Sequence, residues 1–280
     1  MDNMRQKTFL DNLEGYLYYI RIVSKGRVSA LHIITSRNNQ LIKHIRKLTS
    51  DRAYRRSCGL YFGEGPKLLA EALKAGTAIE AVVTAQGVDL PGLDGLWRAE
   101  VPADLLDSLC DTRTPQGVLF LAKMPGLSPP ERLEGGRWLV LDGLQDPGNV
   151  GTIWRTADAL GADGLILVNH CADPFSPKTV RATMGACFRL PVYEAEVQAL
   201  PGLLERSGLP LYAAALGEDS VTVGAVRLSR CAVVIGSEGR GVSPELLRLS
   251  EKTVKIPMRE RCESLNAAVA AAVILWEMGR

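Results

Sequence analysis

Three segments of this 280-residue sequence place polar side chains beside turn residues, where they could carry chemistry. The first reads "QDPGNVGTIWRTADALG". Its Asp-Pro-Gly predicts a turn, after which Asn149 can cap a helix that carries Arg155 nearly two turns later. Both side chains could face the mouth of a site. Taken alone, however, the segment is better explained as a capped helix with an ordinary surface arginine.

The second segment, "CAVVIGSEGRGVSPELL", predicts a buried strand ending at Gly236, a glycine-rich loop around Glu238, and a helix capped by Ser243. Glycines let a ligand approach the backbone closely. The glycine order is not that of a dinucleotide-binding loop and no Gly-Lys-Ser/Thr follows, so nucleoside-triphosphate binding is disfavoured. A Glu238 carboxylate that only caps neighbouring amides is the alternative.

The third segment, "RCESLNAAVAAAVILWEM", predicts a polar loop followed by a long apolar helix. Ser264 is the predicted N-cap of this helix. Asn266 would then lie inside the first turn, where an amide in an apolar helix usually needs a functional reason.

The surroundings of these segments predict an α/β fold. From Arg137 onward, apolar runs typical of strands alternate with helical patterns, which predicts a parallel sheet with helices on both faces. Ligands of such sheets bind beyond the carboxyl ends of the strands, where the three segments lie.

An earlier α/β domain precedes this sheet. Leu41, Ile45 and Leu48 share one helical face, "GLYFGEG" reads as a strand, and "PKLLAEALKAG" starts with proline and ends with glycine, as helices do. A Pro- and Gly-rich stretch predicts a linker between the two domains. The predicted parts, an unassigned extension, a small domain, a linker and a larger domain, cover residues 1–30, 31–124, 125–136 and 137–280.

Composition narrows the function. The longest apolar run, 267–276, is far shorter than the roughly 20 residues of a membrane-spanning helix, and no secretion signal begins the chain, so we expect a cytoplasmic protein. The six cysteines lack the spacing of metal or redox sites, which predicts reduced, mostly buried thiols and no metal. The three histidines suggest no catalytic triad.

Basic residues cluster between positions 31 and 60, against the single acid Asp51. Such a cluster is typical of proteins that bind phosphate backbones, and it is equally compatible with a solvated helix face. The cations are Arg37, Lys43, Arg46, Lys47, Arg52, Arg55 and Arg56.

Together and in this order, the three polar segments closely resemble the SpoU (TrmH-like) family of RNA ribose methyltransferases, of the SPOUT superfamily. The family patterns N-x-G-x-x-x-R, G-x-E-x-x-G and S-L-N are matched by Asn149, Gly151 and Arg155, by Gly236, Glu238 and Gly241, and by Ser264, Leu265 and Asn266. The segment "SPKTVRATMGACFRLPV" resembles the family's RNA-facing loop and helix, with Lys178 and Arg181 available for phosphate. The basic domain is similar, more loosely, to a ribosomal-protein-like substrate-binding domain.

The resemblance implies a C-terminal trefoil knot, S-adenosylmethionine bound among the knot loops, and a homodimer of catalytic domains in which the helix at 264–278 is a candidate contact surface. It implies that the catalytic residues are Asn149, Arg155, Glu238, Ser264 and Asn266. It implies that the cofactor lies against Leu216, Gly236, Ile256, Pro257, Met258 and Leu265.

The chemistry implied is methyl transfer to a ribose 2′-hydroxyl. The sulfonium of S-adenosylmethionine supplies the electrophile, so no metal is required. Family accounts sometimes make the arginine equivalent to Arg155 a general base, but a guanidinium stays protonated in proteins. We therefore predict that Arg155 binds the adjacent phosphate and stabilises the developing alkoxide, while the other four catalytic residues fix the ribose and Arg155.

The predicted substrate is 23S ribosomal RNA, because the appended N-terminal domain resembles that of the family's ribosomal-RNA enzymes. The alternatives are a transfer-RNA 2′-O-methyltransferase and a non-catalytic ribosome- or RNA-binding protein of the same fold. A nucleotide-dependent enzyme that uses the loop at 236–241 is a more distant alternative, because the chain lacks a phosphate-binding loop lysine.

Overall fold

The computed structural model describes residues 31–217, 219–259 and 264–280. The predicted extension at 1–30 lies outside the described residues. The chain divides into two compact units: the first runs up to Pro125 and includes Phe175–Pro177, and the second comprises Gly126–Pro174 and Lys178–Arg280. No helix in the described ranges is long and apolar enough to cross a membrane.

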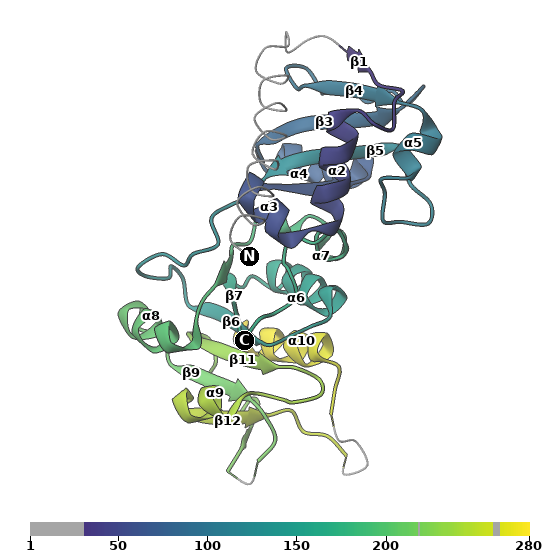
Figure 1. Ribbon diagram of the computed structural model, residues 1–280. Helices are drawn as coiled ribbons and strands as arrows, with labels where there is room; N and C mark the ends of the chain where they lie inside the picture. Colours follow the sequence, from purple (N-terminus) through teal and green to yellow (C-terminus); the bar gives the residue numbers. More distant parts are fainter. Residues whose placement is uncertain (1–30, 218, 260–263) are drawn as a thin grey trace, which may run out of the picture. The chain divides into compact units, whose positions relative to one another are not determined.

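The first unit is a small α/β domain (Figure 1). Its described elements are β1 (Leu31–Ile33), α2 (Gln40–Ser50), α3 (Arg52–Cys58), β2 (Leu60–Glu64), α4 (Pro66–Lys74), β3 (Ile79–Ala85), β4 (Arg98–Val101), α5 (Ala103–Asp107) and β5 (Val118–Lys123). The strand order is β1-β4-β3-β5-β2. Strand β4 pairs parallel with β1 and β3, whereas β5 pairs antiparallel with β2 and β3.

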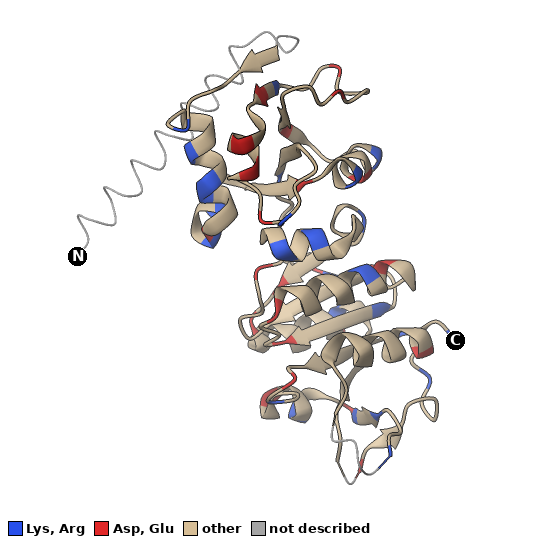
Figure 2. Ribbon diagram, turned by 90° about the vertical axis from the view of Figure 1, so that its right-hand side faces the viewer, with Lys and Arg blue, Asp and Glu red and all other residues tan. Residues whose placement is uncertain are grey.

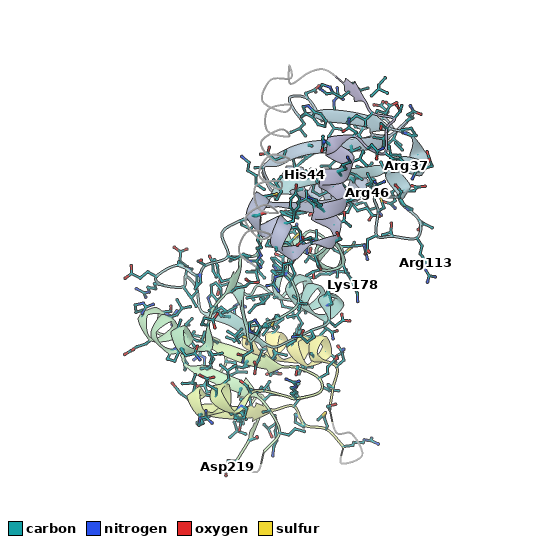
Figure 3. All side chains as sticks on the ribbon, viewed as in Figure 1. Arg37, His44, Arg46, Arg113, Lys178 and Asp219 are labelled. Atoms are coloured by element: carbon teal, nitrogen blue, oxygen red, sulfur yellow. The ribbon has the colours of Figure 1, made fainter. Side chains whose placement is uncertain are left out.

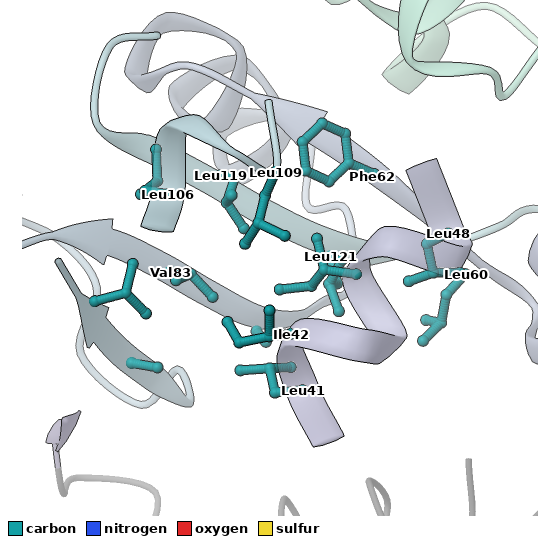
Figure 4. Close-up of a cluster of buried hydrophobic side chains, with 14 of the residues drawn as sticks. Leu41, Ile42, Leu48, Leu60, Phe62, Val83, Leu106, Leu109, Leu119 and Leu121 are labelled. Atoms are coloured by element: carbon teal, nitrogen blue, oxygen red, sulfur yellow. The ribbon is translucent and has the colours of Figure 1, made fainter. Parts of the chain in front are cut away.

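Helix α2 covers this sheet with the apolar face that the sequence predicts. Leu41, Ile45 and Leu48 are buried, and they belong to the same core cluster as Phe62 and Leu121 of the sheet (Figure 4). Burial of each such side chain contributes about 1.5–3 kcal/mol to folding. The helical pattern therefore identified the face of α2 that packs on the core of this unit.

The second unit contains a seven-stranded sheet in its described part. Its elements are β6 (Arg137–Asp142), α6 (Pro147–Ala159), β7 (Gly164–Val168), α7 (Pro177–Thr183), η1 (Ala186–Phe188), β8 (Val192–Glu194), η2 (Val197–Ala199), α8 (Leu200–Ser207), β9 (Leu211–Ala214), β10 (Val221–Thr222), β11 (Cys231–Gly236), α9 (Pro244–Leu249), β12 (Lys252–Lys255) and α10 (Ala267–Met278). The strand order is β10-β12-β9-β11-β6-β7-β8, and every pair is parallel. The predicted parallel sheet flanked by helices is confirmed.

Both faces of this sheet are covered. Val140 of β6 and Val234 of β11 point to the face where Leu204 of α8 and Leu246 of α9 complete one core cluster. Helix α6 packs against β7, α10 packs against β11, and α6 and α10 contact each other (Figure 1). The sheet is therefore buried on both sides, as its uninterrupted apolar strands require.

The carboxyl ends of three central strands lie side by side. Asp142, the last residue of β6, is in register with Gly236 at the end of β11 and with Val168 at the end of β7. The loops that follow these strands therefore emerge at one edge of the sheet, where ligands of parallel sheets bind.

Two helix starts differ from the sequence prediction. Asp146 caps α6: its carboxylate accepts a 3.0 Å hydrogen bond from the N–H of Asn149, which lies inside the first turn. The prediction that Asn149 is the cap was wrong, because Pro147 sets the first helical position and keeps the residue before it extended.

Helix α10 begins later than predicted, whereas α6 begins earlier. Its N-cap is Asn266, whose Oδ1 accepts hydrogen bonds from the N–H groups of Ala268 at 3.0 Å and Val269 at 3.3 Å. The predicted cap, Ser264, lies before the helix, because an asparagine two residues nearer to the apolar run can take the cap position.

Candidate active site

Three polar side chains from the predicted segments meet at the carboxyl edge of the parallel sheet. Glu238 Oε1 accepts hydrogen bonds from Nδ2 of Asn149, at 2.9 Å, and from Nδ2 of Asn266. Asn266 Nδ2 also donates to Asn149 Oδ1 at 3.2 Å. The structure thus brings together three of the five residues predicted to be catalytic, and we call them the polar cluster.

The start of α6 positions Asn149. The N–H of Asn149, donating to Asp146, lowers the pKa of that carboxyl below its usual value, and Lys178 Nζ, 3.3 Å from the carboxylate, lowers it further. Two residues after Asn149, a Cβ added to Gly151 would lie 2.6 Å from both Ala182 Cβ and the Thr179 carbonyl oxygen. Only glycine lets α6 pack this closely on α7.

The loop after β11 presents Glu238. Ser237 and Gly241 exchange two backbone hydrogen bonds, of 3.1 and 2.8 Å, so the loop folds back on itself. A Cβ at Gly236 would lie 2.1 Å from the carbonyl carbon of Gly241, and Gly241 itself has a φ of 67°. Glycine at these two positions closes the loop tightly and leaves the Glu238 carboxylate at its tip.

Asp142 is a functional candidate that the sequence reasoning missed. Its side chain is only 4% exposed; Oδ2 accepts a 2.6 Å hydrogen bond from the N–H of Ser243, and Oδ1 accepts one of 2.7 Å from Asn169 Nδ2. It therefore ties the Glu238 loop to the loop after β7. An acid closing a buried apolar strand, as in "WLVLD", was the signal that could have found it.

A cavity of about 430 Å³ opens beside the polar cluster, which is in the size range of small-molecule sites. It is bounded by the ends of β9, β11 and β12 and by the start of α10. Five of the six predicted cofactor contacts line it, together with Glu238 and Ser264, whereas Pro257 is not among the lining residues. The five are Leu216, Gly236, Ile256, Met258 and Leu265.

Arg155 does not belong to the polar cluster. Its side chain is exposed on α6 and lines neither this cavity nor its neighbour. The reason is spacing: six residues along a helix separate Arg155 from Asn149 by about 9 Å along the axis. Ser264 lines the cavity but makes no hydrogen bond to the polar cluster within the described residues.

The predicted RNA-contact cations differ in exposure. Arg37, Lys43, Arg46, Lys47 and Arg52 are exposed in the first unit, and Lys178 is exposed and Arg181 half-buried in the second. Figure 2 colours the Lys and Arg residues of the ribbon blue, and Figure 3 labels Arg37, Arg46 and Lys178. Arg37 pairs with Asp104 at 2.6 Å.

Arg55 departs from the sequence expectation of a surface cation. It is only 3% exposed, and its Nη1 donates to the carbonyl oxygens of Leu48 at 2.6 Å and Thr49 at 3.3 Å. This guanidinium binds the end of α2, because the following helix turns it inward, and it is not offered to a phosphate. Arg56 is half-buried.

The thiols and histidines of the described residues show no reactive arrangement. Burial raises the pKa of Cys171 to about 11 and lowers the pKa of His44 to about 4, so both are neutral at pH 7. Cys58, Cys110, Cys187 and Cys231 are also free, and Cys262 lies outside the described residues. No group of His, Cys, Asp and Glu in the described ranges could hold a metal ion.

Comparisons with known proteins match both units. Residues 136–276 match the SpoU rRNA Methylase family, and residues 39–120 match the MRM3-like substrate binding domain. The chain is 31% identical over 248 residues to the 23S rRNA (guanosine(2553)-2'-O)-methyltransferase RlmP of Bacillus subtilis, covering 88% of this chain and 98% of that protein.

Two further proteins similar to this chain are also named as rRNA methyltransferases. The 23S rRNA (uridine(2479)-2'-O)-methyltransferase of Streptomyces viridochromogenes is 35% identical over 196 residues, which cover 65% of this chain and 58% of that protein. The crystal structure of an AdoMet-bound rRNA methyltransferase from Sinorhizobium meliloti superposes with a TM-score of 0.79 at 32% identity, covering 89% of this chain and 97% of that one.

Proposed function

This chain belongs to the SpoU rRNA methylase family, and we propose that it transfers a methyl group from S-adenosylmethionine to a ribose 2′-hydroxyl of 23S ribosomal RNA. The observation that carries the proposal is the polar cluster of Asn149, Glu238 and Asn266 at the rim of the 430 Å³ cavity. Two helix starts distant in sequence converge there on the Glu238 carboxylate, beside a pocket fit for a small molecule.

The residues of the cavity fit S-adenosylmethionine. Leu216, Ile256 and Met258 supply apolar walls, and the bare backbone at Gly236 lets a planar base approach closely. Leu216 is 60% exposed at the wall of the cavity, so a bound ligand can cover its side chain. When bound, the cofactor supplies the electrophilic methyl group.

The polar cluster would hold the ribose. Glu238 Oε1 accepts hydrogen bonds from both asparagines, whereas Oε2 accepts none from the described residues, so it can accept the hydrogen bond of a ribose hydroxyl. With Asn149, Ser264 and Asn266, it would fix the 2′-oxygen in line with the methyl group.

Arg155 would act from outside the pocket. Its position about 9 Å along α6 from Asn149 suits contact between its guanidinium and a phosphate next to the target ribose. There its charge stabilises the alkoxide that develops at the 2′-oxygen.

The first unit would bind the RNA, with support from its match to a substrate-binding domain. Phosphate contacts would come from Arg37, Lys43, Arg46, Lys47, Arg52 and Arg56, and from Lys178 and Arg181 of the second unit. Ribosomal RNA is favoured over transfer RNA because the relatives above, which cover 88%, 65% and 89% of this chain, are named as 23S or rRNA enzymes.

A second copy of the chain is the proposed partner, in the cytoplasm. Val269 and Trp276 of α10 are 49% and 58% exposed, and their spacing places them on one helical face with the half-buried Val273. An exposed apolar stripe on an otherwise buried helix suits a symmetric helix-to-helix contact. The proposal includes the C-terminal trefoil knot that the family resemblance implies.

Transfer of a labelled methyl group tests the function. Purified protein, labelled S-adenosylmethionine and ribosomal RNA are expected to give a 2′-O-methylated nucleotide that resists alkaline cleavage, and transfer RNA is expected to give none. Glu238→Ala is expected to lower the single-turnover rate about 100-fold, with Glu196→Ala, an exposed glutamate elsewhere in the unit, unchanged. Label in transfer RNA alone would contradict the proposal.

A further inference from the structure

A second cavity, of about 840 Å³, lies beside the proposed cofactor pocket. The loops that follow β6, β7 and β11 form its walls. Glu238, Arg240 and Ala267 line both cavities, so the Glu238 loop is the partition between them. A ribose held at the polar cluster would therefore have the cofactor on one side and this second space on the other.

The lining of the second cavity disfavours a phosphate. Asp142, Asp146 and Glu238 contribute carboxylates, against Arg240 as the one cation among its lining residues. Anions are repelled by such a wall, whereas groups that donate hydrogen bonds are attracted. The volume lies in the range of small-molecule pockets, which accommodates a nucleobase.

Two side-chain amides that line this space use their amino groups in hydrogen bonds to the protein. Gln145 Nε2 donates to the carbonyl oxygens of His170, at 2.7 Å, and Gly143, at 3.2 Å, and Asn169 Nδ2 donates to Asp142 at 2.7 Å. With each amino group engaged, the amide oxygen is the atom left to accept a hydrogen bond from a ligand. No described residue donates to Gln145 Oε1 or Asn169 Oδ1, and both residues line the cavity.

The backbone is strained at Asn169 and at His170, whose carbonyl oxygen accepts from Gln145. Asn169 and His170 have φ values of 52° and 57°, a left-handed conformation that costs non-glycine residues of order 1–2 kcal/mol each. The conformation orients both the Asn169 side chain and the His170 carbonyl that anchors Gln145. Strain that fixes two acceptors at the wall of a cavity indicates a binding role.

We propose that the second cavity holds the target base, turned out of the RNA stack, and that Gln145 Oε1 and Asn169 Oδ1 accept hydrogen bonds from its N–H groups. The proposal rests on the methyl transfer above, with the ribose at the polar cluster. Unstacked bases are the usual objects of sequence-specific RNA recognition. Guanine fits two acceptors best, because its ring N1–H and exocyclic N2 amino group are adjacent donors.

Replacing guanosine with inosine at the methylated position tests this assignment, because inosine lacks the N2 amino group. We expect the methylated nucleotide to be guanosine and inosine RNA to lower kcat/KM of the wild-type protein about tenfold, as for one lost hydrogen bond. One of the two residues accepts from the N2 amino group of guanine. Whichever variant removes that acceptor, Gln145→Leu or Asn169→Gly, is expected to methylate the guanosine and inosine RNAs with equal kcat/KM. The glycine keeps the left-handed backbone, and calorimetric binding of S-adenosylmethionine checks folding.

Gln198→Leu is the matched control, since Gln198 is exposed in the same unit and lines neither cavity. It is expected to keep the tenfold preference for guanosine. A target base other than guanosine, or an inosine effect of the same size in wild type and both variants, would overturn the base subsite alone. If the wild-type protein methylated no RNA at all, the proposed function itself would fall, and the subsite with it.

Discussion

Asn149, Glu238 and Asn266 owe their arrangement to helix starts and a tight loop. Each asparagine lies at the first turn of a helix, and Glu238 lies on a loop closed by glycines. One carboxylate oxygen accepts from both amides, which removes most of their rotational freedom. The two helix starts and the shared carboxylate oxygen therefore hold the three side chains together.

Sequence reasoning found these residues by pattern but not their contacts. Asn149 and Asn266 were identified, yet the capping roles of Asp146 and Asn266 were assigned to Asn149 and Ser264. Asp142 was missed because it makes its hydrogen bonds to Asn169 and to the N–H of Ser243, 27 and 101 residues away in sequence. Contacts of that separation leave no local signal.

Arg155→Lys tests the predicted role of the guanidinium. Lysine keeps the charge but loses the planar fork that binds phosphate through two hydrogen bonds, so kcat/KM is expected to fall about 100-fold. Steady-state methylation of ribosomal RNA measures the effect. Arg227→Lys, at an exposed arginine outside both cavities, is the control. Turnover near the wild-type value in Arg155→Lys would disprove the proposed phosphate contact through two hydrogen bonds.

At the level of elements, the parallel sheet determines where the loops meet. The register of Asp142 with Gly236 and Val168 puts the ends of three strands together, and α6 and α10 pack side by side. Strand positions were predictable because buried parallel strands are continuous apolar runs. The strand order was not, since insertion of β11 between β9 and β6 depends on contacts distant in sequence.

Gly151→Ala tests the close packing of α6 on α7. The added Cβ would lie 2.6 Å from Ala182 Cβ and from the Thr179 carbonyl oxygen, so the free energy of unfolding is expected to fall by about 1–3 kcal/mol. Urea denaturation measures it. Gly126→Ala, where nothing lies within 4 Å of the new Cβ, is the control. An equal free energy of unfolding for both variants would show that α6 and α7 can move apart without loss of stability.

At the scale of the whole molecule, the proposed function assigns RNA binding to the first unit and methyl transfer to the second. The first unit carries most of the exposed cations predicted to contact RNA, and the second carries the polar cluster and both cavities. Phosphate contacts give affinity without sequence information, whereas base contacts give specificity. Binding of the RNA and selection of the nucleotide are therefore expected to respond to different mutations.

The double variant Lys43→Ala/Arg46→Ala is expected to weaken RNA binding and to make it less dependent on salt. Each lost phosphate contact lowers the slope of log affinity against log salt by roughly 0.7–0.9. Filter binding at several salt concentrations measures the slope. Lys74→Ala, an exposed lysine at the end of α4, is the control. An unchanged slope in the double variant would remove α2 from the RNA interface.

Trp276→Glu tests the proposed dimer. A charge in the exposed stripe of α10 would be desolvated in a helix-to-helix contact, so the variant is expected to sediment as a monomer. Analytical ultracentrifugation distinguishes the two states. Leu249→Glu, at a 38% exposed leucine of α9, is expected to stay dimeric. A wild-type chain that sediments as a monomer would contradict the dimer directly.

Mapping of ribose methylation across all RNA from cells lacking this protein tests the central claim most directly. We predict that one 2′-O-methyl group is lost from 23S ribosomal RNA and that the wild-type gene restores it, whereas a gene encoding Glu238→Ala does not. Unchanged ribosomal RNA, or a methyl group lost only from transfer RNA, would contradict the account.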